Sequence, residues 1–224
     1  MTGEPSAQTR VLFIASGDKH LLQRITQRQN GRLNQYRIHD VVSIAGNVPG
    51  GLVPGCALVR IENDGPIQLA EESQPASEVP IITFRGVTQH LHYTTVTQRQ
   101  VLDMRSRAEL EPSNETTAVL IPIRKSLKWW QLAQDERQVY FQTSDEHEDH
   151  IAIGLRYADR VFRKLYHCRY TSPPAVYDFL TYFEFHSSHK DDFRMLLNEL
   201  RNTVRNPEWA YIELEFEIWM TKIR

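Results

Sequence analysis

The chain has 224 residues, of which 41% are hydrophobic and 24% charged, and its formal net charge is −2. This is the composition of an ordinary globular protein, and it gives no electrostatic support for nucleic-acid binding. No apolar run approaches the ~20 residues that span a bilayer, and the polar start MTGEPSAQTR is unlike a signal peptide. Cys56 and Cys168 are too few for a disulfide framework or a thiolate zinc site. We therefore expect a cytoplasmic protein.

The first half of the chain is predicted to be mostly β. Residues 1–9 are expected to form a disordered tail, and RVLFIA (10–15) a strand that stops at turn-forming residues. Two strands joined by a hairpin at Asn30-Gly31 are predicted over 19–46. A loop rich in Gly and Pro follows, then strands at 56–62 and 80–86. In the segment 88–104 the apolar residues follow neither the helical period of 3.6 residues nor the strand period of two. Helix and strand therefore both remain possible for this segment.

The second half has clearer periodicity. TAVLIP (117–122) predicts a strand, and Ser126 is a plausible N-cap for a helix through about residue 141. A second helix is predicted from about residue 150, because four apolar residues recur at helical spacing. These are Ile151, Leu155, Ala158 and Phe162.

Three more elements complete this half. Strands are predicted at 165–168 and 177–185, and a helix from about residue 190 that includes Val204 on its inner face and ends at Asn206-Pro207. From Ile212 to Met220 apolar residues alternate with glutamates, which predicts a final strand. Residues 117–222 therefore spell β-α-β-β-α-β, the ferredoxin-like order. We predict an α+β barrel built from a degenerate, mostly β half over 10–116 and a complete ferredoxin-like half over 117–224.

Histidines near an acidic segment offer one possible metal site. His147 and His150 are three apart and could share a helix face, among acidic residues that suit zinc or manganese. The same acidic residues are equally typical of a solvated turn before a helix, where the helix dipole favours them. The sequence contains no Gly-rich phosphate loop and no nucleophile elbow. Composition and spacing alone therefore leave the function open.

Five separated segments resemble those of chlorite dismutases. They are IPIRKSLKWWQLAQDER (121–137), HIAIGLRY (150–157), FRKLYHCR (162–169), YDFLTYFEF (177–185) and EWAYIELEFEI (208–218). The resemblance is greatest to the short, truncated, dimeric branch of that family. It covers the C-terminal half well, residues 83–106 more weakly, and residues 1–80 hardly at all.

The resemblance implies a haem b site. His150 matches the proximal iron ligand, and Arg163 matches the distal catalytic arginine. Glu208 matches the acceptor for the imidazole N–H, with Lys125 as the partner of that carboxylate. The positions implied to line the haem edge or to approach a propionate are Trp129, Tyr93 and Arg124.

Elementary chemistry agrees with this set. An imidazole that binds iron through one nitrogen needs an acceptor for its other N–H, and a buried carboxylate in that role must itself be paired. His150 and Arg163 are 163 − 150 = 13 positions apart, about 20 Å of rise if the segment is wholly helical. They cannot crowd one side of a haem from a single helix, so we expect the haem to lie between helix and sheet.

Each residue also has a plainer interpretation. His150 could be a helix cap, and Arg163 could pair with Asp159 four residues before it. Lys125 and Glu208 could form an exposed salt bridge worth ~0–1 kcal/mol. The two tryptophans could belong to the core, as most tryptophans do.

The activity implied by the resemblance is conversion of chlorite to chloride and dioxygen, through an oxo-ferryl intermediate and transient hypochlorite, by a homodimer. The alternatives are a coproporphyrin-iron decarboxylase of haem synthesis and a non-enzymatic haem carrier or sensor. Two departures from the family pattern predict a more open distal pocket. No distal glutamine can be placed in RSRAELEPSNE (105–115), and Ala158 stands where a larger aliphatic residue is expected.

Overall fold

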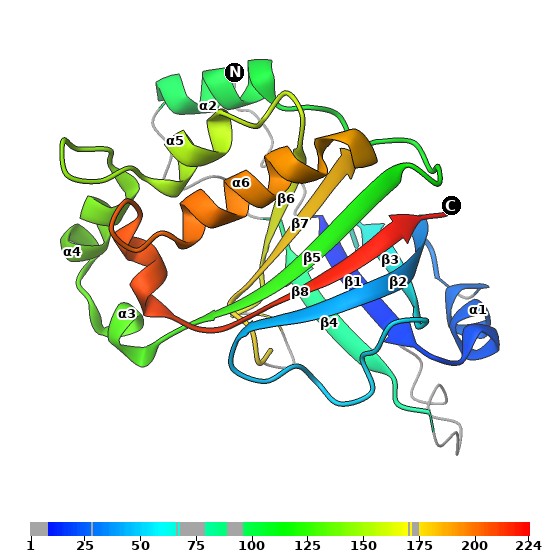
Figure 1. The fold of residues 1–224 in the computed structure, drawn as a ribbon. Helices are drawn as coiled ribbons and strands as arrows, with labels where there is room; N and C mark the ends of the chain where they lie inside the picture. The colour runs from blue at the N-terminus through cyan, green and yellow to red at the C-terminus, as the bar shows by residue number, and fades with distance from the viewer. Residues whose placement is uncertain are drawn as a thin grey trace, which may run out of the picture.

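The computed structural model describes residues 9–27, 29–65, 67, 79–88, 96–169, 171 and 175–224. Its eight antiparallel strands form one closed barrel in the order β1-β3-β2-β8-β5-β7-β6-β4 (Figure 1). The first four strands are β1 (Arg10–Ser16), β2 (Arg32–Ala45), β3 (Ala57–Asn63) and β4 (Ile82–Val87). The others are β5 (Thr116–Lys125), β6 (Phe162–His167), β7 (Phe179–His186) and β8 (Ile212–Lys222). The predicted α+β barrel is confirmed.

Each half of the chain supplies four neighbouring strands. The successions β4-β1-β3-β2 and β8-β5-β7-β6 correspond strand for strand. Long pairing of β2 with β8 joins the halves on one side, and the pair Val87↔His167 of β4 and β6 joins them on the other. The description of the halves as ferredoxin-like units stays a prediction. The predicted tail lies outside the described residues except for Thr9, whose N–H donates to the Thr88 hydroxyl (3.1 Å).

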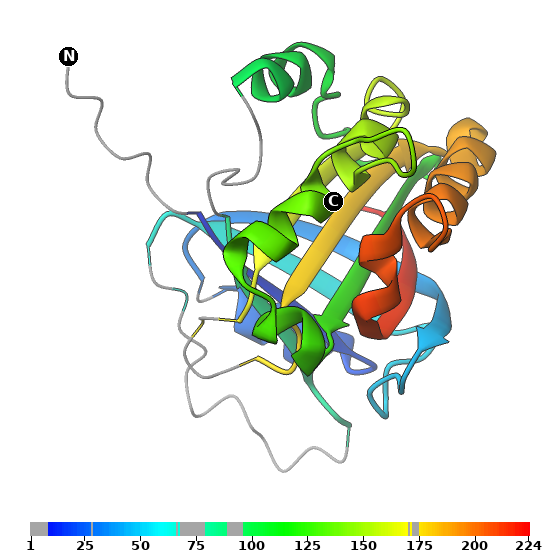
Figure 2. The ribbon, with the colours of Figure 1, turned by 90° about the vertical axis from the view of Figure 1, so that its left-hand side faces the viewer.

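Most described helices follow strands of the second half. They are α3 (Leu127–Gln131), α4 (Gln134–Gln138), α5 (His150–Leu155) and α6 (Lys190–Arg201), with the 3₁₀ turns η2 (Val139–Phe141), η3 (Ser187–His189) and η4 (Pro207–Tyr211). Figure 2 shows these helices covering one face of the strands. The ambiguous segment contains helix α2 (Val96–Arg105). No described helix is long and apolar enough to cross a bilayer.

The hairpin predicted at Asn30-Gly31 is wrong, because helix α1 (Lys19–Gln27) precedes β2. Asp18 caps this helix by accepting the Leu21 N–H (3.0 Å). The helix buries its apolar residues against the outer face of β1 and β3, among Leu21, Leu22, Ile25, Leu12, Ile14, Val59 and Ile61. Gly31 is needed because the backbone of Glu62 lies close to it, and not because it forms a hairpin turn. Its φ is +134°, and a Cβ there would lie 2.3 Å from the Glu62 carbonyl oxygen.

Two predicted helices of the second half are too long. The one over 126–141 begins at Ser126 as expected, but extended backbone at Leu132 and Ala133 divides it into α3, α4 and η2. The one from residue 150 ends at Leu155, and Phe162 opens strand β6. The helix predicted from residue 190 is also too long, because α6 ends at Arg201 and leaves Val204 82% exposed. Apolar residues at helical spacing thus continue past the end of the helix to which they were assigned.

The barrel interior ends in a cluster of buried charges. Arg60 and Lys222 are fully buried, and both contact Glu109, at 2.8 and 3.1 Å. Lys222 also pairs with Glu184 at 2.9 Å, and Arg60 with Glu62 at 2.7 Å. Burial alone would raise the pKa of Glu62, but the Arg60 guanidinium lowers it to about 2. Paired in this way, the charges tolerate burial, and the loop that carries Glu109 is fixed against the barrel end.

Candidate functional site

Three residues far apart in the sequence meet at the end of β5. His150 is the first residue of α5, Glu208 lies in η4, and Lys125 is the last residue of β5. The His150 Nδ1 lies 2.7 Å from Glu208 Oε2, and the Lys125 ammonium donates to Glu208 Oε1. The Lys125 and Glu208 side chains are 6% and 5% exposed. The structure therefore excludes the exposed salt bridge considered above.

The charge state of Glu208 decides what His150 can do. Burial alone would raise the pKa of this carboxyl, but the Lys125 ammonium and the His150 ring lower it to about 2. The ionised carboxylate accepts the Nδ1–H of His150, which leaves Nε2 as the nitrogen with a lone pair. No hydrogen bond of Nε2 is found within the described part of the chain. His150 is thus prepared to bind a metal through Nε2.

Asp149, not His150, caps helix α5. Its side chain is buried and accepts the N–H groups of Ile151 (2.8 Å) and Ala152 (2.9 Å). The Thr143 hydroxyl donates to its other oxygen at 2.6 Å. These bonds fix the first turn of α5 and with it the backbone of His150. The sequence analysis missed this role, although an Asp directly before an apolar helix is an N-cap signal.

His147 does not join His150. Its Nδ1 lies 3.0 Å from the Ser144 hydroxyl and its Nε2 lies 3.2 Å from the Val139 carbonyl oxygen, so both ring nitrogens are engaged. His147 also precedes the helix, so the two rings share no helix face. Across the described ranges, no group of three or more His, Cys, Asp or Glu could hold a metal ion. The geometry therefore gives no support to the zinc or manganese alternative.

The helix face that carries His150 is open. Gly154 lies one turn beyond His150 on this face, and a Cβ built there would meet no atom within 4 Å. On β6, Arg163 pairs with Phe183 and Leu165 with Thr181. Because Phe183 packs with Ile153 of α5 in one core, Arg163 and Leu165 face the helices. His150, at the start of α5, and Arg163, on β6, therefore both lie on the helix side of the sheet, and we call the region between them the recess.

Arg163 lines this recess without a protein partner. Its side chain is exposed, and desolvation by the protein around it lowers its pKa, while the charge of Glu208 opposes that shift. Asp159 pairs with its neighbour Arg160 at 3.3 Å, and no ion pair or hydrogen bond of Arg163 with another described residue is found. The fork of donors of this guanidinium is therefore available to a small anion.

The remaining predicted residues lie in different places. Trp129 is buried beneath the Lys125 ammonium, which lies 3.3 Å from its ring centroid. Arg124 precedes Lys125 on β5, and its nearest carboxylate is Glu213 at 3.8 Å, so it is not brought to His150. Tyr93 lies outside the described residues.

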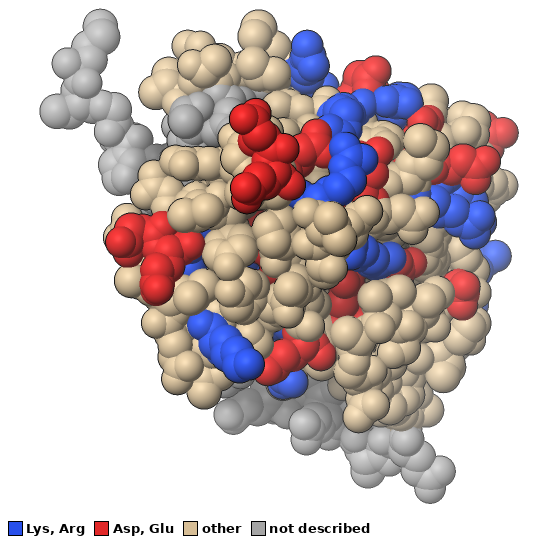
Figure 3. Space-filling model, turned by 60° about the vertical axis from the view of Figure 1, so that its left-hand side comes forward, with Lys and Arg blue, Asp and Glu red and all other residues tan. Residues whose placement is uncertain are grey.

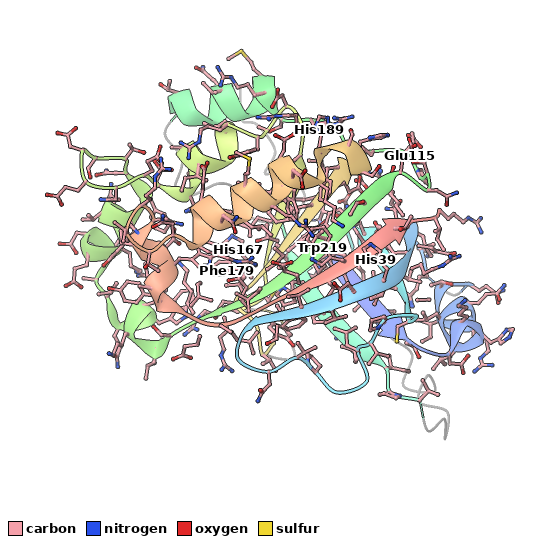
Figure 4. All side chains as sticks on the ribbon, in the orientation of Figure 1. His39, Glu115, His167, Phe179, His189 and Trp219 are labelled. Carbon is pink, nitrogen blue, oxygen red and sulfur yellow. The ribbon has the colours of Figure 1, made fainter. Side chains whose placement is uncertain are left out.

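Two further aromatic residues continue the strand wall of the recess. His167 follows Arg163 and Leu165 on the same face of β6, with its ring 5.1 Å from that of Phe179 (Figure 4).

The outer surface over α5 carries both acidic and basic side chains. Arg156 pairs with Glu148 and Glu199, and Arg205 pairs with Glu148 at 2.7 Å. Figure 3 shows acidic and basic side chains interspersed on this side of the molecule. The face therefore has no basic stripe that would suit nucleic acid.

Replacing the cap tests how firmly α5 holds His150. Asp149→Ala removes an acceptor of two backbone N–H groups and leaves the Thr143 hydroxyl without its partner, so a loss of about 1–2 kcal/mol in the free energy of unfolding is expected. Asp149→Asn keeps the capping oxygen and should lose less than half as much. Chemical denaturation measures both. Equal losses in the two variants would contradict the capping role.

Comparison with known proteins identifies the fold. No protein-family model matches the sequence. A dimeric chlorite dismutase from Nitrobacter winogradskyi is 28% identical with a TM-score of 0.65, and the match covers 93% of this chain and 99% of that one. The chain has the chlorite dismutase fold. A chlorite dismutase from Candidatus Nitrospira defluvii in complex with imidazole shares 17% identity with a TM-score of 0.66, covering 96% and 91%.

The residues of this chlorite dismutase fold suit a haem. The unpartnered Nε2 of His150 is an axial nitrogen donor, and the glycine face of α5 admits a flat group. The partnerless Arg163 supplies a cation on the opposite wall. A haem there would be held by His150, oriented through Glu208 and Lys125, and edged by the aromatic residues of the strand wall.

Proposed function

We propose that the chain is a haem b-dependent chlorite dismutase that converts chlorite to chloride and dioxygen. The supporting observation is the pairing of two features across one recess. His150 is fixed through Nδ1 by an ionised, lysine-paired Glu208, and Arg163 lies on the helix side of the sheet with no ion pair to another described residue. A site that combines a basic axial imidazole with an unpaired guanidinium suits redox chemistry on a small oxyanion.

The protein residues would divide the work as follows. When bound, the haem supplies the redox chemistry that breaks a Cl–O bond. Glu208 accepts the hydrogen bond from the His150 Nδ1–H and draws that proton toward its carboxylate. The imidazole thereby becomes a stronger electron donor through its other nitrogen. Lys125 balances the buried carboxylate. Arg163 presents a planar fork of donors that holds chlorite, and then the hypochlorite released from it, close to where dioxygen forms.

Oxygen release tests the proposal against its rivals. Purified protein loaded with haem b and supplied with chlorite should yield one dioxygen for each chlorite in an oxygen electrode. A haem carrier or sensor would keep a haem spectrum but release no dioxygen above free haem. A coproporphyrin-iron decarboxylase would instead convert iron coproporphyrin to haem in the presence of peroxide. The charge of Arg163 favours the first reaction, because the decarboxylases usually carry an uncharged distal residue.

We propose that the chain forms a homodimer. The supporting observation is that the Nitrobacter winogradskyi protein, which matches this chain over almost its whole length, is a dimeric chlorite dismutase. Trp130 is a candidate interface residue, since it is partly exposed and stacks under the Arg169 guanidinium at 3.9 Å. Light scattering should give twice 26.2 kDa. A pentamer or a monomer at micromolar concentration would contradict this assembly.

A further inference from the structure

A chain of aromatic rings leads away from His150 behind the recess. The Phe141 ring lies 5.7 Å from the His150 ring and 5.9 Å from Trp129, almost perpendicular to both. Trp129 in turn lies 5.5 Å from Tyr140 and 5.3 Å from Tyr211. These spacings are those of edge-to-face packing. Together the rings form a continuous aromatic contact from the candidate ligand to a pair of tyrosines.

The two tyrosines at the end of this chain are bonded to each other. Their hydroxyl oxygens are 2.8 Å apart, and their rings are 5.4 Å apart. Tyr140 comes from η2 and Tyr211 from η4, the turn that also carries Glu208. Trp129 is buried, whereas both tyrosines are only half-buried. The chain of rings therefore runs from the site toward solvent.

Simple packing does not require this arrangement. Half-buried phenols can hydrogen-bond to water, yet these two hydroxyls pair with each other at the point where both rings contact Trp129. The hydrogen bond to Tyr211 raises the pKa of Tyr140 to about 12, so at neutral pH Tyr140 stays a protonated phenol. Such a pair can give up an electron and a proton together.

Lys125 decides where a missing electron would reside. Its ammonium lies 3.3 Å from the Trp129 ring centroid, and a cation at that position repels a positive charge on the indole. A tyrosine avoids this penalty, because it becomes neutral when its phenolic proton leaves. The tyrosines, not Trp129, are therefore the stable end of the chain.

We propose that Tyr140 and Tyr211 form an electron-donor pair that protects the site when a peroxide oxidises it. This inference rests on the proposed haem site. Hydrogen peroxide takes up two electrons as its O–O bond breaks, one from the haem and one from the pair; one oxygen leaves as water and the other stays with the oxidised haem. One phenol of the pair loses that electron, and its hydrogen leaves as a proton to bulk water. A neutral tyrosyl radical remains, next to solvent, where a small one-electron reductant such as a thiol or ascorbate returns an electron and water returns the proton.

The test uses haem-loaded full-length protein mixed with one equivalent of hydrogen peroxide and freeze-quenched for electron paramagnetic resonance. The natural chain should give a neutral tyrosyl signal. Tyr140→Phe/Tyr211→Phe keeps both rings but removes both hydroxyls, so the signal should disappear and more haem absorbance should be bleached per equivalent of peroxide. Tyr157→Phe is the matched control, because Tyr157 donates to Glu199 (2.8 Å) outside the chain of rings. That control should match the natural chain in signal and bleaching.

Three results would overturn the proposal. They are the absence of a tyrosyl signal in the natural chain, an unchanged signal in the double variant, and equal loss of signal in the Tyr157→Phe control. Haem binding is recorded first by the optical spectrum. Normal haem binding without the radical refutes the tyrosine pair and leaves the proposed function standing. A chain that takes up no haem refutes both.

Discussion

Replacing His150 by alanine is expected to abolish stable haem binding. His150 supplies the only imidazole nitrogen that faces the recess unpaired among the described residues near α5, and its acceptor Glu208 acts only through it. Losing partners of a metal ligand costs about 10–100-fold in affinity, so losing the ligand itself should exceed 100-fold. Titration of the purified variant with haem, followed by the optical spectrum and by gel filtration, measures this loss.

His147→Ala is the matched control. The two histidines lie three residues apart, but both nitrogens of His147 are engaged by Ser144 and Val139. Haem affinity should therefore stay within twofold of that of the natural chain. Haem loss in both variants, or in neither, would show that the ligand has been assigned to the wrong residue.

The second half of the fold could be predicted because its elements carry strong local signals. The alternation from Ile212 to Met220 directs apolar side chains into the barrel core, and the intervening Glu215 is buried against Arg201 of α6 at 2.6 Å. Such a strand is specified by its own sequence. Helix lengths were less predictable, because the extended residues at Leu132 and Ala133 leave no proline or glycine to mark the break.

The first half was harder, and α1 shows why. Its three apolar residues, Leu21, Leu22 and Ile25, do lie at helical spacing, but three positions within nine residues make a short signal that the Asn30-Gly31 turn pattern outweighed. What makes the segment helical is the outer face of β1 and β3, against which Leu21, Leu22 and Ile25 are buried. That face exists only after the barrel closes. Tertiary packing here overrides a local turn signal at Asn30-Gly31.

The candidate site depended on resemblance rather than on spacing. Lys125, His150 and Glu208 are separated by up to 83 positions, so no local pattern could bring them together. The structure adds two residues to the site. Asp149 caps the helix that begins at His150, and Gly154 leaves the next turn of that helix face without a side chain. The structure also shows that Trp129 packs beneath the Lys125 ammonium, and the haem-edge role of Trp129 stays a prediction. The predicted residues that the structure brings into direct contact are Lys125, His150 and Glu208, whose chemistry requires an ammonium, an imidazole and a carboxylate.

Replacing Arg163 by alanine tests the mechanism rather than the binding of haem. Arg163 lies on β6, across the recess from α5, and no hydrogen bond or ion pair with His150 or Lys125 is found among the described residues. The variant should therefore bind haem with an unchanged spectrum and still cleave chlorite. Removing one preorganised contact can lower a rate by about 10²–10³, but a smaller loss is expected here if Ala158 gives the more open distal pocket that the resemblance predicts.

What should change most in this variant is the fate of hypochlorite. Without the guanidinium, more hypochlorite escapes before dioxygen forms and bleaches the haem, so the total oxygen yield per haem falls. A hypochlorite trap should slow the bleaching in the variant more than in the natural chain. Arg163→Lys should restore only part of the yield, because it keeps the charge without the planar fork. Arg160→Ala, which removes a surface arginine paired with Asp192, is the control and should leave the yield unchanged. If the yield of Arg163→Ala equals that of the natural chain and does not respond to the trap, Arg163 does not hold the reacting anion.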